Sequence, residues 1–423
     1  MKWWCVLLLC LPLGAQSEEF NFDISNYEKP RYELNGYLEA LTSRSSLDTD
    51  SALYNLQTFD LGQPDTLLQR QATIQLEGVY RFTESRLQAR YLAQAQNMDT
   101  FGYQTQSVFH EVYYSDNHFK NLTIDIGKRV QKWGKGYAWN PVGFVERKKD
   151  PNDPDLSREG YVMLDADYVR SLDGDLKTLA ITPVILPVTK DINNDYSNKE
   201  DTNYAAKLYL LYRDIDLDFM MLAKGSQSAK YGMDFSGNVS SSFELHGELA
   251  YIADQQVAIL DSANSLVTSS RNSIQSLLGF RYLTENETTI IGEYYHNGAG
   301  YSEQELTQFY KLAGSDFSLD PSLLVPARRA SNAGYGKANP GRDYLYISAV
   351  IKEPYQLVYF NIGAFSIVNI ADQSYSLTPE LSYSGVNNTE LRLRLTMLRG
   401  GANTEFGEKV NQQKIELRFR YFF

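Results

Sequence analysis

The last eleven residues, Gln413 to Phe423, constrain the fold more than any other stretch of the chain. Apolar and mainly charged residues alternate there, with Ile415, Leu417, Phe419, Tyr421 and Phe423 standing between Glu416, Arg418, Arg420 and Phe422. A repeat of two residues is the pattern of a β-strand whose two faces meet different environments. A soluble sheet with one face in water shows the same alternation, so the rest of the chain has to separate the two cases.

The composition favours a membrane environment. The 423-residue chain contains 31 Tyr and 20 Phe, and none of its apolar runs reaches the roughly 18 residues that a membrane-spanning helix needs. Aromatic residues favour strands and membrane interfaces. A closed barrel is the other structure that satisfies every backbone group inside a membrane. The sequence therefore predicts an all-β fold, a transmembrane antiparallel β-barrel.

The alternation recurs along the chain and predicts about 18 strands, within a range of roughly 16 to 18. The strands are expected at 31–42, 69–83, 85–97, 107–116, 120–130, 159–171, 175–186, 203–214, 215–224, 229–239, 242–256, 270–284, 286–297, 343–352, 355–370, 373–385, 388–400 and 411–423. Even-numbered connections are tight, and most odd-numbered ones are long. Short periplasmic turns and long extracellular loops are typical of outer-membrane barrels.

The N-terminus divides the chain further. Residues 1–15 have the pattern of a secretory signal peptide, with Lys2 ahead of the apolar stretch Trp3–Leu13. Residues 16–30 are expected to form a polar N-terminal segment and residues 31–423 a single barrel domain. Both cysteines of the chain lie in the signal peptide, so the mature chain is expected to have no disulfide.

Orienting the apolar side chains toward lipid turns the charged ones into the lumen. On one side we expect an arginine wall of pore-lining residues, comprising Arg81, Arg86, Arg90, Arg129, Arg392, Arg394, Arg418 and Arg420. Opposite it we expect an acidic wall, comprising Asp216, Asp218, Glu244, Glu248 and Glu293. The resulting transverse field resembles that of diffusion porins. The alternative is that these charges pair with neighbours such as Glu416 and Glu77 inside a plugged interior.

Residues 127–161 are the most distinctive stretch, since basic and aromatic side chains are interleaved there. Trp faces bind sugar rings and Lys or Arg attract anions, and the residues expected to contact a solute are Lys132, Trp133, Lys135, Trp139 and Arg147. Arg129 followed by Trp133-Gly134 and Asn140-Pro141 resembles a segment of porin-like barrels of the alginate-export kind and of related uncharacterised outer-membrane families. The resemblance implies a substrate-contacting loop folded toward the pore.

Two alternatives apply to the end of this stretch. In an ordinary surface loop, its aspartates would pair with the adjacent basic residues. Asp150, Asn152, Asp153 and Asp155 also offer closely spaced oxygen ligands for Ca²⁺, but they lack the Gly and the terminal Glu of an EF-hand loop. We therefore predict no metal site. Further along, Ser302 and Glu305 form a capping-box pattern that predicts a short helix over 302–312.

These features predict a channel in the bacterial outer membrane for the diffusion or export of small hydrophilic solutes, acidic sugars and other organic anions among them. The alternative is a closed barrel that acts in surface binding or envelope assembly. A hydrolase is less favoured, because the sequence has no G-x-S-x-G, Walker or H-E-x-x-H motif. We expect no enzyme activity and no cofactor.

The expected partners follow from this environment. They are outer-membrane lipid and lipopolysaccharide, the transported solute, and the barrel-assembly machinery through the C-terminal strand that ends in Phe423. Nucleic acid is not expected, because the formal net charge is -12 and nucleic-acid binders present a basic surface.

Overall fold

The computed structural model describes residues 30–154 and 156–423, and that part of the chain contains 18 strands. The strands are β1 (Tyr32–Leu47), β2 (Thr66–Arg81), β3 (Ser85–Met98), β4 (Gly102–Asp116), β5 (Leu122–Arg129), β6 (Tyr161–Ser171), β7 (Leu176–Val188), β8 (Asp201–Tyr212), β9 (Ile215–Leu222), β10 (Lys230–Ser240), β11 (Phe243–Leu260), β12 (Leu266–Leu283), β13 (Thr288–Asn297), β14 (Asp343–Lys352), β15 (Phe360–Asn369), β16 (Tyr375–Tyr383), β17 (Thr389–Arg399) and β18 (Asn411–Phe422). The helices are α1 (Ala52–Thr58), α2 (Glu303–Ala313) and α3 (Leu324–Ala330), with short segments η2 (Pro321–Leu323), η3 (Ser331–Tyr335) and η4 (Pro354–Gln356). The expected signal peptide and residues 16–29 lie outside the described residues.

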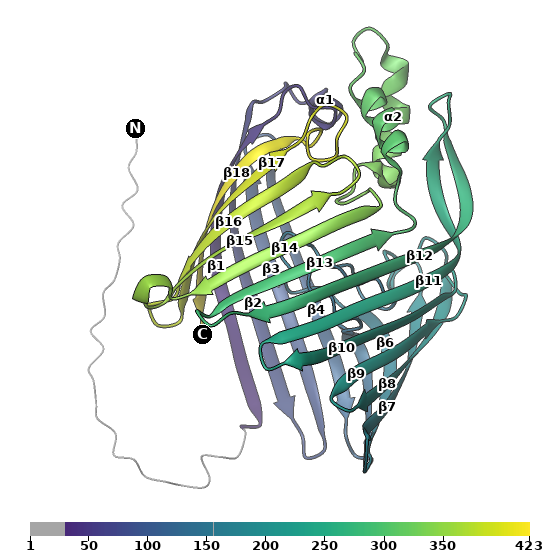
Figure 1. The fold of residues 1–423 in the computed structure, drawn as a ribbon, viewed down its shortest axis with the longest axis vertical. Coiled ribbons are helices and arrows are strands. Elements are labelled where there is room, and N and C mark those ends of the chain that lie inside the picture. The colour runs from purple at the N-terminus through teal and green to yellow at the C-terminus, as the bar shows by residue number, and fades with distance from the viewer. Residues whose placement is uncertain (1–29, 155) are drawn as a thin grey trace.

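The strands form one closed antiparallel barrel (Figure 1). Each strand pairs with the next in sequence, and β18 pairs with β1 from Tyr37↔Phe422 to Leu47↔Asn411. Phe423 and Gly36 exchange backbone hydrogen bonds of 3.0 and 2.9 Å. Closure removes the strand edges whose unpaired N–H and C=O groups a hydrocarbon environment would not tolerate. The predicted 18-strand antiparallel barrel is therefore confirmed.

The two faces of the barrel differ as the alternation predicts. In β18, Ile415 and Phe419 are 54 % and 46 % exposed on the outside, whereas Glu416 and Arg418 are 7 % and 9 % exposed and face inward. Among the described residues, no helix is both long and apolar enough to cross a membrane. The apolar side chains therefore cover the outer wall, and the charged side chains are directed to the lumen.

The two ends of the barrel also differ. At the turn end, β8 and β9 are joined by Arg213 and Asp214 alone, and both have positive φ (47° and 67°), as in the two-residue turns of hairpins. The sequence predicts a tight turn at residues 353–354 and a strand that starts at 355. Both predictions are wrong. Residues 353–359 form a longer connection that includes η4, and β15 begins only at Phe360. Positive φ at Glu353, Tyr355 and Tyr359 interrupts the extended backbone there.

At the loop end, the long connections fold into a helical cap, which we define as α1, α2, α3 and η3. The helices stand on the upper rim of the barrel (Figure 1). Their shared core includes Leu53, Phe309 and Tyr335, and it packs on Val257 and Leu260 of β11. Ser302 and Glu305 form the expected capping box, so the predicted helix at 302–312 is confirmed as α2.

Candidate functional site

The connection between β5 and β6, described over residues 130–154 and 156–160, folds into the barrel, and we call it the lumen loop. Its acidic-side anchor is Glu248 of β11, whose carboxylate accepts the backbone N–H groups of Lys135 (2.7 Å), Gly136 (2.6 Å) and Val142 (3.2 Å). Gly134 lies at φ +93°, and a Cβ there would be 2.6 Å from Glu248 Oε1. Glycine therefore lets the loop backbone approach this carboxylate.

A second carboxylate of the acidic wall holds the next residues of the lumen loop. Glu293 of β13 accepts the N–H of Ala138 (2.8 Å) and that of Tyr137. The ammonium group of Lys135 lies 2.9 Å from Asp218 of β9. Glu248, Glu293 and Asp218 are almost fully buried. The central part of the acidic wall therefore binds the loop and does not face open water.

The two tryptophans of the loop pack against the inner wall. Trp133 is 1 % exposed and lies in a buried cluster with Met163, Leu186 and Leu222 of the barrel. Trp139 is 7 % exposed, and its ring stacks on Tyr295 at 5.0 Å. Truncating a buried Trp costs about 3–5 kcal/mol, so these contacts fix the loop in the lumen. The ring of Trp133, expected to contact a solute, has no accessible face.

The tip of the lumen loop is held on the other side of the barrel. Asp153 lies 3.4 Å from Arg394 Nη1 of β17 and 3.3 Å from Arg418 Nη2 of β18. Burial alone raises the pKa of Asp153, but the charges of Arg394 and Arg418 outweigh it and hold the pKa below its usual value. Asp153 is therefore ionised at neutral pH, and it latches the loop tip to the arginine wall. Asp153 is one of the candidate Ca²⁺ ligands, and the two arginines occupy its carboxylate. Asp155, another candidate ligand, lies outside the described residues.

Most arginines of the arginine wall are paired with carboxylates. The distances are 2.6 Å for Arg420–Glu39, 3.2 Å for Arg418–Glu416, 2.9 Å for Arg392–Glu390, 3.0 Å for Arg90–Glu111, 2.9 Å for Arg129–Asp165 and 2.7 Å for Arg81–Glu33, and Arg394 also contacts Glu380. Arg86 lies opposite Arg81 in the strand register, with an exposed side chain. The wall exists as a set of positions, but its charge is largely neutralised by carboxylates on the same strands and their neighbours.

The remaining predicted residues lie in several environments. Asp216 accepts a hydrogen bond from Tyr209 (2.5 Å), and Glu244 lies 3.4 Å from the hydroxyl of Tyr137. Arg147 pairs with Glu159 (3.4 Å) and Asp195 and covers the ring of Tyr161. Lys132 is exposed and lines a cavity on the turn side of the lumen loop.

Two cavities meet at the lumen loop. One, of about 560 Å³, lies toward the loop end, and the other, of about 830 Å³, lies toward the turn end along β2–β5. Lys149 of the loop lines both cavities. A third cavity, of about 460 Å³, adjoins the first at Ala338 and Asn339. Through these shared residues the three cavities form a series along the lumen, and this series is the candidate path of a solute.

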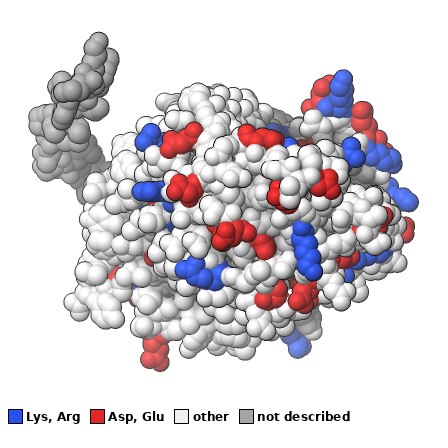
Figure 2. Space-filling view, turned by 90° about the horizontal axis from the view of Figure 1, so that it is seen from above, with Lys and Arg blue, Asp and Glu red and all other residues white. Residues whose placement is uncertain are grey.

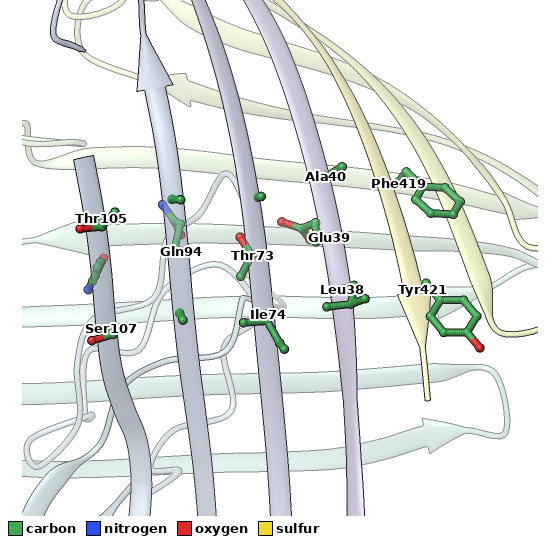
Figure 3. Close-up of a pocket in the computed structure, with 14 residues that line it drawn as sticks. Leu38, Glu39, Ala40, Thr73, Ile74, Gln94, Thr105, Ser107, Phe419 and Tyr421 are labelled. Atoms are coloured by element: carbon green, nitrogen blue, oxygen red, sulfur yellow. The ribbon is translucent and has the colours of Figure 1, made fainter. Parts of the chain in front are cut away.

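A further hollow of about 810 Å³ lies outside this path (Figure 3). Its lining combines small residues such as Ala40 and Ala72 with Leu38, Phe419 and Tyr421, which are 48 %, 46 % and 41 % exposed on the outer wall. It is therefore a depression in the apolar outer surface. From above, the loops cover the barrel mouth and carry charges of both signs, without a wide central opening (Figure 2).

The sequence prediction omitted residues that the fold brings to the cavity at the loop end. Lys148, Lys149, Lys230 and Lys337 all line it, and they come from the lumen loop, β10 and the β13–β14 connection. Inward alternation along β10 would have identified Lys230. Local sequence gives no signal that Lys337, far along the chain, ends beside Lys148.

No protein-family model matches the chain, and no curated protein matches it. Among solved structures, it is similar to OccK5 (OpdH) of Pseudomonas aeruginosa, with 11 % identity over 92 % of this chain and 98 % of that one and a TM-score of 0.52. For OccAB3 of Acinetobacter baumannii the identity is 10 %, over 93 % of this chain and 99 % of that one, and the TM-score is 0.51. For OccAB1 of Acinetobacter baumannii the identity is 9 %, over 92 % and 96 %, and the TM-score is 0.52. At this identity the likeness concerns the fold alone, a closed barrel shared over nearly the whole length of both chains.

Proposed function

We propose that this barrel, which has the fold of outer-membrane porins, is a channel in the bacterial outer membrane for small hydrophilic solutes. One observation carries the proposal. Two cavities on opposite sides of the lumen loop both reach Lys149. The loop narrows the lumen at that point, and a solute that passes through contacts its polar surface.

The chemistry of the two surfaces supports this environment and use. The outer wall exposes Ile415, Leu417 and Phe419, which suit hydrocarbon. The cavity toward the turn end is lined by Gln75, Gln88 and charged groups. A barrel of this strand number leaves an aqueous lumen when loops do not fill it. Water and hydrophilic solutes are therefore the natural contents of the path.

A closed barrel that binds partners at the cell surface is the second candidate, and the helical cap favours it. The cap forms its own buried core, with Phe309 and Tyr335 fully buried, and it covers part of the barrel mouth. Val325 of α3 and Leu319 of the segment between α2 and η2 are 55 % and 85 % exposed and offer apolar contact area. In that case the lumen loop would act as a plug.

Single-channel recording in planar bilayers separates the two candidates. The refolded full chain is expected to produce ohmic conductance steps in potassium chloride, and addition of neutral sugars of increasing size is expected to reduce them until the sugars no longer enter. Correctly folded protein that inserts into the bilayer but gives no steps would establish the closed barrel instead.

A further inference from the structure

The cavity at the loop end, which we call the vestibule, has an unusual charge composition. Four lysines line it, namely Lys148, Lys149, Lys230 and Lys337, and its lining includes no Asp or Glu. The chain as a whole is acidic, with 52 Asp and Glu against 40 Lys and Arg. A carboxylate-free cavity with four ammonium groups therefore departs from the general surface of this protein.

None of these lysines forms an ion pair within the described part of the chain. Lys230 Nζ donates to Gln227 Oε1 at 2.6 Å and lies 5.7 Å from the ring centre of Phe144. Lys149 Nζ donates to the carbonyl of Gly136. An ammonium group has three donors, so each of these two retains capacity for a ligand.

Lys148 is the centre of the group. Its side chain stays exposed to the lumen. Enclosure by the barrel lowers the pKa of Lys148, and the charge of Lys337 lowers it further. Lys337 follows η3, where Tyr335 stacks on Tyr301 with ring centres 3.7 Å apart. The packed cap therefore holds one positive charge beside another, an unfavourable arrangement that an anion would relieve.

The rest of the vestibule is suited to hydroxyl groups. Seven of its lining residues carry amide side chains, namely Asn140, Gln227, Gln255, Gln256, Gln275, Asn297 and Asn339. Part of their capacity is used within the protein, since Gln227 donates to the carbonyl of Tyr196 and Gln255 accepts from Ser273. Each amide offers both donors and an acceptor. Trp139 and Tyr295 are stacked on each other at the wall, so their faces are partly occupied. Hydrogen bonding, more than ring stacking, is the means of holding a sugar-like solute here.

We propose that the vestibule is a binding site for phosphate monoesters of hydroxylated solutes, such as sugar phosphates. The inference rests on the proposed channel for its route, since Lys149 connects the vestibule to the cavity below. The ammonium groups of Lys148, Lys230 and Lys337 surround the phosphate, and the amides bind the hydroxyls. The site lies inside the barrel, so the phosphate belongs to a water-soluble molecule and not to a lipid headgroup.

The distribution of the two basic residue types favours phosphate over carboxylate. Arginine forks match planar carboxylates in bidentate pairs, whereas lysine acts as a compact point charge. Most arginines of the wall already have carboxylate partners. A phosphate monoester carries close to two negative charges near neutral pH. Several positive point charges around it therefore attract it more strongly than they would attract a singly charged carboxylate.

Calorimetric titration of the refolded full chain in detergent tests the site. Glucose 6-phosphate is the probe, and glucose and gluconate are the neutral and singly charged comparators. We expect glucose 6-phosphate to bind at least about tenfold more tightly than gluconate, and glucose to give no measurable binding at the same concentrations. The double variant Lys148→Gln/Lys337→Gln should bind glucose 6-phosphate about tenfold more weakly, a loss equivalent to about 1.4 kcal/mol.

The matched control is Lys190→Gln/Lys311→Gln, which removes two exposed lysines outside the vestibule and should leave the affinity unchanged. Lys148→Arg/Lys337→Arg keeps both charges and should retain most of the binding. This variant tests the site even if the Gln variant folds poorly. Equal affinity for glucose 6-phosphate and gluconate, or an unaffected Gln variant, overturns the site. Bilayer recordings on the same preparation separate the two claims: conductance without binding removes only the site, and binding without conductance removes only the channel.

Discussion

The arginine wall and the lysine vestibule are both basic regions of one lumen, and they differ in their partners. In the wall, Arg394 and Arg418 share Asp153, and Arg420 pairs with Glu39. In the vestibule, Lys148 and Lys337 have no carboxylate within ion-pair distance in the described chain. Paired charges hold the structure together, and unpaired charges remain available to a solute. The number of basic residues on a strand therefore does not measure the field in the lumen.

The largest effect is expected from removing the anchor opposite the arginine wall. Glu248→Ala leaves three backbone N–H groups of the lumen loop without their acceptor, and each unsatisfied buried group costs about 1–3 kcal/mol. The loop should leave the inner wall, and single-channel conductance should rise several-fold. Glu244→Ala is the control, since the contacts of Glu244 within the described residues are long, at 3.4 Å to Tyr137 and Ser236 and 3.7 Å to His246 Nδ1. Unchanged conductance in Glu248→Ala would show that the remaining contacts, among them those of Glu293 and Trp133, hold the loop without Glu248.

An intermediate effect is expected from opening the latch at the wall. Asp153→Asn removes the carboxylate shared by Arg394 and Arg418, so the loop tip loosens and two arginines lose part of their neutralisation. The wall should then resemble the vestibule in having some positive charge without a carboxylate partner. Reversal potentials in a salt gradient should shift toward anions, with a smaller rise in conductance than in Glu248→Ala. Asp150→Asn is the matched control, because within the described residues the side chain of Asp150 bonds only to Asn152. A shift toward cations in Asp153→Asn would contradict the latch.

The smallest effect is expected from the residue that connects the two cavities. Lys149→Gln removes one positive charge beside the path without disturbing an ion pair. The anion-to-cation permeability ratio should fall by about twofold at low salt, and this change should fade in molar salt as the Debye length shortens to about 3 Å. Lys190→Gln should show no change. An effect of the same size at both salt concentrations would mean that Lys149 acts by shape and not by charge.

The sequence by itself determined the barrel and the orientation of its strands. Alternation with a period of two is local, and outside and lumen demand opposite polarity at every second residue, so Ile415 and Glu416 reveal their faces without any knowledge of their partners. The same logic places Arg394, Arg418, Glu248 and Glu293 on the inner face. It failed at residues 353–359, where left-handed backbone at Tyr355 breaks the extended path that alternation assumes.

Only the tertiary structure decided which charges are neutralised and where the lumen loop runs. Arg418 and Asp153 are separated by 265 positions, and Gly136 and Glu248 by 112, so their contacts depend on barrel closure and on the path of a loop with no periodic pattern. The vestibule likewise brings together Lys148, Lys230 and Lys337, which come from two connections and one strand. The sequence gives the charge of each residue, but three-dimensional packing decides which charges pair within about 4 Å.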